Sequence, residues 1–182
     1  MPLSESSGIM TTGILRARSW SKTLAGGEGG YYGRLFLNIQ DREPQGFIPA
    51  EDAPRVLGEI KSKLESLADE SGQHIGTRCF LPKEIYPTVE GIPPDLLIYF
   101  GDLSWRSLGT VGWNRVHVLE NDTGPDDANH EQHGLIIAYD PRNPAKGRQL
   151  ENAHLLQISP TVLTIPGIET PKTMRLPGLL LS

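Results

Sequence analysis

The chain has 182 residues, of which 37% are hydrophobic and 21% charged, so its apolar content is enough for one domain core and too little for two. A net charge of −5, with no cluster of Lys or Arg, disfavours nucleic acid as a partner. The apolar stretches are far shorter than the roughly 20 residues of a membrane helix. The single cysteine, Cys79, is typical of a reducing compartment. We therefore expect one cytoplasmic domain with no membrane or nucleic acid partner.

The first half of the chain predicts a lead-in, a strand and a helix. Residues 1–30 lack periodicity and end in four glycines, which favours a flexible segment with no phosphate-binding role. Residues 31–39 alternate between two faces, as in a pleated strand. Apolar residues then recur at helical spacing over 56–67 behind Pro54, with Gly72 as the terminator.

The second half predicts three strands and a short helix. Residues 75–81 and 95–100 are strand-like, and 95–100 and 135–139 are apolar enough to be buried on both faces. A helix over 160–165 follows, with Ser159 as its N-cap. This alternation favours an α/β fold, a partial layered sheet with flanking helices.

An acidic loop over residues 121–134 is the richest source of candidate ligands. His130 and His133 lie in it together with several carboxylates, and imidazole and carboxylate groups bind zinc or manganese. The alternative is a solvated acidic loop whose histidines are incidental, because two histidines three residues apart are not a specific pattern. Cys79 lies in an apolar run, which favours a small core residue over a nucleophile. His117 falls in an alternating stretch and is predicted to be a strand residue.

Several segments in a shared order resemble the C-terminal part of the type I phosphodiesterase and nucleotide pyrophosphatase group. That group belongs to the alkaline phosphatase superfamily, and the resemblance is strongest to its prokaryotic phosphohydrolase or phosphomutase branch. The similarity runs from about residue 20 to residue 168. It is carried by the sequences at 29–38, 42–46, 94–96, 121–124, His130 with 134–137, and 158–163.

The resemblance implies a fold, a reaction and one site residue. Residues 31–182 would form the C-terminal portion of an alkaline phosphatase-like domain that hydrolyses phosphate esters. Such enzymes use two divalent metals, which neutralise phosphoryl oxygens and lower the pKa of a Thr or Ser nucleophile. The last metal ligand of the family is a histidine four residues before the glycine that opens a core strand. His130 has that position relative to Gly134, so the resemblance makes His130 the zinc or manganese ligand and His133 dispensable.

The family's other catalytic motifs are missing from this chain. Its nucleophile motif, its Asp-x-x-x-His pair and its Asp-His-Gly motif would precede Trp20, and none is present, so we assign no catalytic residue. Smaller departures occur at Gln157 and over residues 174–178. We therefore expect a C-terminal fragment, inactive alone, that contributes one ligand to a site completed by an N-terminal half. The alternative, from another class, is a non-catalytic interaction or structural module.

The resemblance also leads to a geometric expectation. If the strand over 135–139 runs antiparallel to the strand over 95–100, His130 lies at the carboxyl end of the latter, near Gly101 and Asp102. Asp122, Asp126 and Asp127 should then lie close enough to orient the imidazole. A fragment with unpaired strands should also expose apolar surface and self-associate.

Overall fold

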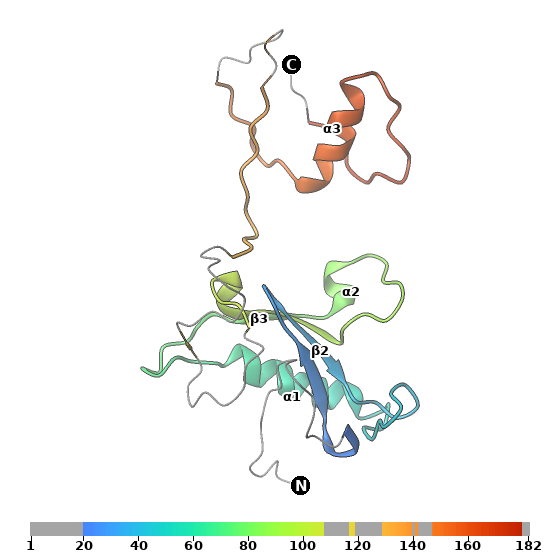
Figure 1. Cartoon of the computed structure of the whole chain (residues 1–182), viewed down its shortest axis with the longest axis vertical. Helices are drawn as coiled ribbons and strands as arrows, with labels where there is room; N and C mark the ends of the chain where they lie inside the picture. The colour runs from blue at the N-terminus through green and yellow to red at the C-terminus, as the bar shows by residue number, and fades with distance from the viewer. Residues whose placement is uncertain (1–19, 108–116, 119–128, 140, 142–146, 180–182) are drawn as a thin grey trace. The chain divides into compact units, whose positions relative to one another are not determined.

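A computed structural model describes residues 20–107, 117–118, 129–139, 141 and 147–179. The chain divides into two compact units, residues 1–133 and 134–182 (Figure 1). Mixed α and β structure confirms the expected α/β class in its coarse form. No helix in the described ranges is long and apolar enough to cross a membrane.

The first unit is built on a four-stranded sheet in which every neighbouring pair of strands is antiparallel. In spatial order its strands are β1 (Ala25–Glu28), β2 (Gly33–Leu37), β4 (Leu96–Tyr99) and β3 (Arg78–Phe80). Ile98 of β4 pairs with Gly33 of β2 on one side and with Cys79 of β3 on the other. This confirms the strands expected within 31–39, 75–81 and 95–100.

Helix α1 (Ala53–Glu65) packs on one face of this sheet (Figure 1) and closes the core. Alternation in β2 sends Leu35 and Leu37 to that face, where they meet the fully buried Leu64 of the helix. Pro54 lies in the first turn of α1, as expected, because its missing N–H is not needed there. Short helices surround this core: η1 (Trp20–Lys22), α2 (Pro82–Ile85) and η2 (Phe100–Leu103).

The second unit contains η3 (Leu155–Gln157) and α3 (Ile158–Thr164), so the expected helix is confirmed. Its N-cap is Gln157, and the assignment of Ser159 is wrong because the preceding η3 turn extends the helical backbone toward the N-terminus. Thr161 is buried, and its hydroxyl donates to the Gln157 carbonyl and accepts from the Leu179 amide. One threonine thus ties the end of the described chain to α3.

Three expectations about individual segments are wrong. The expectation of a flexible segment over residues 1–30 is wrong for residues 25–28. They form β1, because backbone pairing with β2 orders even a glycine-rich segment. Residues 135–139 form no strand and are exposed, since a strand that is apolar on both faces needs neighbours and covering layers on both sides. His117 lies outside any strand.

Candidate functional site

His130 lies at the carboxyl end of β4. Its ring stacks on Tyr31 with the ring centroids 4.0 Å apart and the planes 9° from parallel. Tyr31 comes two residues before Gly33, which pairs with Ile98, and the two strands are antiparallel. Tyr31 therefore lies beyond the last residue of β4, and His130 lies at the end of the sheet where we expected it.

The residue before His130 fixes the loop to this end of the sheet. The Asn129 side-chain amide donates to the Leu103 carbonyl in η2. Its amide oxygen accepts from the His130 backbone N–H at 2.9 Å. Because one side chain holds both the turn after β4 and the His130 backbone, the position of the imidazole is defined by more than the stacking.

The turn that receives Asn129 has an unusual backbone. Gly101, Asp102 and Leu103 have φ values of 56°, 52° and 75°, a left-handed conformation that is costly for the latter two residues. Arg78 of β3 pairs with the Asp102 carboxylate at 3.1 Å and helps to hold this turn. A Cβ at residue 101 would meet the Trp105 ring, so glycine is required there for space as well as for φ. Strained backbone of this kind concentrates at functional sites.

A cation also lies near the Tyr31 ring. The Arg106 guanidinium lies 5.7 Å from the centre of the Tyr31 ring. Ser107, the next residue, accepts the Gly30 amide at 2.9 Å and joins the start of β2 to the segment after β4. We call Tyr31, Arg106 and His130 the Tyr31 platform. It combines an aromatic ring, a permanent positive charge and an exposed imidazole at one end of the sheet.

The described residues do not form a metal site by themselves. In the ranges that the structure covers, no group of three or more His, Cys, Asp or Glu side chains converges. Zinc takes four ligands in structural sites and three protein ligands in catalytic ones. His133 is exposed, and Asp122, Asp126 and Asp127 lie outside the described residues. Among the described residues, His130 therefore belongs to no group of three side chains that could hold a metal ion.

His117 is a half-buried histidine that makes contacts the sequence does not predict. Its Nδ1 lies 3.6 Å from the Glu70 carboxylate, and its ring lies 4.2 Å from the Trp105 ring. The Nε2 atom is buried and has no hydrogen-bond partner among the described atoms. No sequence pattern reveals this contact, because 47 residues separate His117 from Glu70.

Cys79 lies in the core, as expected from its apolar neighbours. It is 2% exposed, and its backbone amide donates to the Glu65 carboxylate at 3.1 Å. Burial, and secondarily the nearby Glu65 charge, raises the pKa of the Cys79 thiol to about 12. A thiol that stays protonated is a poor nucleophile.

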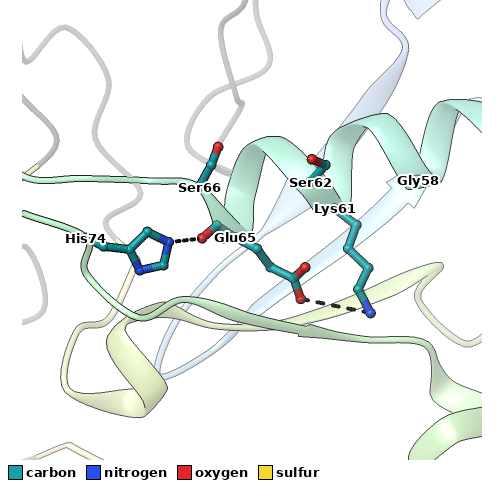
Figure 2. Close-up of a pocket in the computed structure, with 6 residues that line it drawn as sticks. All are labelled: Gly58, Lys61, Ser62, Glu65, Ser66 and His74. Carbon is teal, nitrogen blue, oxygen red and sulfur yellow. Dashed lines mark hydrogen bonds and ion pairs between the residues drawn. The ribbon is translucent and has the colours of Figure 1, made fainter.

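An open groove runs along the second half of α1 (Figure 2). It is lined by Gly58, Lys61, Ser62, Glu65, Ser66 and His74. Its polar groups pair with one another: the His74 ring bonds to the Glu65 carbonyl, and the Lys61 ammonium lies 3.9 Å from the Glu65 carboxylate. His74 also accepts the Gly76 amide at 3.1 Å. These contacts hold the chain after α1 against the helix and give the groove a structural role.

Comparisons with protein-family models, with curated proteins and with solved structures found no match.

Proposed function

We propose that this chain supplies the C-terminal part of a cytoplasmic, metal-dependent phosphohydrolase that acts on phosphate esters. In this proposal it resembles the type I phosphodiesterases and nucleotide pyrophosphatases. Residues 31–182 correspond to the C-terminal portion of an alkaline phosphatase-like domain, and His130 is the ligand that they contribute to a zinc or manganese site. An N-terminal half carries the nucleophile and the remaining ligands, so the isolated chain has no activity.

The placement of His130 is the observation that carries this proposal. An exposed imidazole is fixed at the carboxyl end of a buried strand by a stacked ring and by the Asn129 hydrogen bonds. Stacking uses the face of the imidazole, whereas metal coordination uses a nitrogen lone pair in the ring plane, so one ring serves both contacts. The bound metals of such an enzyme neutralise phosphoryl oxygens, and this chain's part is to hold one nitrogen still.

A non-catalytic interaction module is the second candidate. The observation that favours it is the Tyr31 platform itself, since His130 and Arg106 both pack on the Tyr31 ring. In a purely structural role these contacts fasten the loop to the sheet, and His130 needs no metal.

Hydrolysis of a nitrophenyl phosphodiester separates the two candidates. The chain is assayed alone and together with the polypeptide encoded directly upstream, with zinc or manganese present. We expect background rates for the chain alone and turnover for the mixture. In the mixture His130→Ala abolishes turnover, and His133→Ala, the matched control three residues away, retains it.

Three outcomes would contradict the proposal. The first is an upstream frame without the nucleophile, Asp-x-x-x-His and Asp-His-Gly motifs, which favours the interaction module. The second is equal loss of turnover in both histidine variants. The third is turnover by the isolated chain that depends on His130.

A further inference from the structure

One side chain joins the turn after β4 to the backbone of His130. The Asn129 amide group donates to the Leu103 carbonyl, and its oxygen accepts the His130 backbone N–H at 2.9 Å. All three residues belong to the first unit. The location of the Leu103 carbonyl therefore decides where Asn129 can hold the backbone of His130.

A left-handed backbone sets the direction of the Leu103 carbonyl. Gly101, Asp102 and Leu103 have φ values of 56°, 52° and 75°. This conformation is costly for residues with a Cβ, but Asp and Asn adopt it more readily than the others. A return of Asp102 to the right-handed region would redirect the chain that follows it. The Leu103 carbonyl would then turn away from Asn129.

Two contacts with the rest of the unit hold this turn. The Asp102 carboxylate accepts hydrogen bonds from the Arg78 guanidinium at 3.1 and 3.4 Å, and Arg78 lies in β3, the strand next to β4. Both side chains are about half exposed, so this pair contributes more to geometry than to stability. On the other side, the Trp105 ring lies so close to Gly101 that a Cβ there would approach it to 2.4 Å. The turn is thus fixed from both sides.

The His130 ring lies at the end of this series of contacts. It stacks on Tyr31 with the ring centroids 4.0 Å apart and the planes 9° from parallel. Tyr31 comes just before β2, whereas Asn129 is attached to the turn after β4. The stack therefore requires that this turn hold Asn129 at the end of the sheet where Tyr31 lies.

We propose that Asp102 and Asn129 are positioning residues for His130. Asp102 keeps the turn left-handed and so presents the Leu103 carbonyl, and Asn129 passes that position on to the His130 backbone. The imidazole is thereby held on Tyr31. Neither residue touches a ligand. The inference deepens the proposed function, and it rests on that function only for the metal that the imidazole would bind.

Proton NMR of the full chain measures the position of the imidazole. Protons over the face of an aromatic ring resonate upfield of the same protons in an exposed histidine. The His130 ring signals, identified by their loss in His130→Gln, should be shifted upfield in the wild type, and Tyr31→Leu should remove the shift. All spectra are recorded at one pH, because imidazole signals also change with protonation.

Two substitutions interrupt the proposed series of contacts at different points. Asp102→Ala removes the side chain that favours the left-handed turn and pairs with Arg78. Asn129→Asp keeps the acceptor for the His130 N–H but removes the donor to the Leu103 carbonyl. Each should move the His130 signals to their position in Tyr31→Leu. Asp102→Asn should keep the wild-type signals, because asparagine also adopts the left-handed conformation.

Two control variants separate positioning from a general loss of stability. Asp95 is also a carboxylate paired with an arginine, but it precedes β4 and so lies at the other end of that strand. Asp95→Ala should destabilise the fold and leave the His130 signals of the folded protein unchanged. Asn152→Asp repeats the amide substitution in the second unit, at a residue whose φ is also positive, and should have no effect. Thermal unfolding shows which variants are folded.

The NMR outcomes each decide the question. Wild-type His130 signals in folded Asp102→Ala or in folded Asn129→Asp overturn the role of that residue, and if one variant does not fold, the other decides. An equal change in Asp95→Ala overturns the proposal, because the signals would then report destabilisation alone. Unshifted His130 signals in the wild type overturn it as well.

Zinc binding distinguishes this proposal from the proposed function. In the complex with the polypeptide encoded directly upstream, Asn129→Asp should bind zinc about tenfold or more weakly, as is usual when a group that orients a metal ligand is lost. Asn152→Asp should bind zinc like the wild type. Equal zinc affinity in wild type and His130→Ala refutes the proposed function and leaves the NMR result standing. Weaker binding in His130→Ala with unchanged binding in Asn129→Asp overturns the role of Asn129.

Discussion

Asp95 connects the strands of the core through three backbone and side-chain contacts. One carboxylate oxygen accepts the Leu37 amide at 2.7 Å, and the carboxylate takes two guanidinium hydrogen bonds from Arg42 at 2.7 and 2.6 Å. Arg42 also donates to the Leu37 carbonyl. The Asp95 side chain is 17% exposed and the Arg42 side chain 35% exposed, so these charge-assisted bonds are partly shielded from water. They join the residue before β4 to the end of β2.

Removal of this carboxylate should destabilise the protein clearly. We expect Asp95→Ala to lower the free energy of unfolding by about 1–2 kcal/mol, because it removes the acceptor of the Leu37 amide and two of the Arg42 hydrogen bonds. Arg55→Ala, which removes exposed ion pairs with Asp52 and Glu59, is the control and should change the free energy of unfolding little. Urea denaturation measures both, and equal effects would show that the Asp95 contacts are not a stabilising unit.

The buried thiol of Cys79 gives a pH-dependent prediction. Its pKa in the folded protein is raised to about 12, whereas a thiol in the unfolded chain titrates at about 8.5. Between these values the folded state holds a proton that the unfolded state has lost. The Cys79 contribution is therefore fully present below about pH 8.5 and is lost as the pH rises toward 12. The slope of stability against pH above 8.5 should be shallower in Cys79→Ala, and identical slopes would contradict the assignment.

At the scale of single elements, two glycines should respond oppositely to alanine. Gly58 lies inside α1, where a Cβ would meet open space, so Gly58→Ala should stabilise by about 0.5–1 kcal/mol. Gly101 has a positive φ and lies against Trp105, so Gly101→Ala should destabilise by more than about 1 kcal/mol. Thermal unfolding compares the two variants. A stable Gly101→Ala protein would mean that the turn after β4 is not held in the left-handed conformation.

Elements with a clear local pattern were predictable from sequence. Helix α1 has apolar residues at helical spacing, β2 alternates, and β4 is a continuous apolar run, and all three form in the structure. Strand β1 was not predictable, because its glycines carry no pattern and its order comes from pairing with β2. Residues 135–139 show the opposite case. Their composition is typical of a strand, but they form none, because no strand in the described residues pairs with them.

The candidate site was predictable in position and not in its contacts. The expectation put His130 at the carboxyl end of the strand over 95–100 because of an antiparallel strand over 135–139. That strand does not form, and the ring lies there through its stacking on Tyr31 instead. The Tyr31 stack and the Arg106 contact join residues far apart in the chain, which no spacing rule anticipates. The same is true of His117 beside Glu70.

At the scale of the whole molecule, the two units differ in the apolar side chains that they bury. The first unit has a core of buried Leu, Ile and Cys side chains between α1 and the sheet. The second has exposed apolar side chains around α3 and along 134–139. The two units therefore differ in how much of their apolar surface they bury.

The most direct test of this account is the zinc affinity of the complex formed with the upstream polypeptide, measured by competition with a chromogenic chelator. Wild type and His133→Ala should bind zinc with the same affinity. His130→Ala should bind zinc at least about tenfold more weakly. Loss of a residue that only orients a metal ligand lowers metal affinity by about 10- to 100-fold, and loss of the ligand itself should lower it by at least as much. Equal zinc affinity in wild type and His130→Ala would contradict the central claim that this chain contributes a metal ligand.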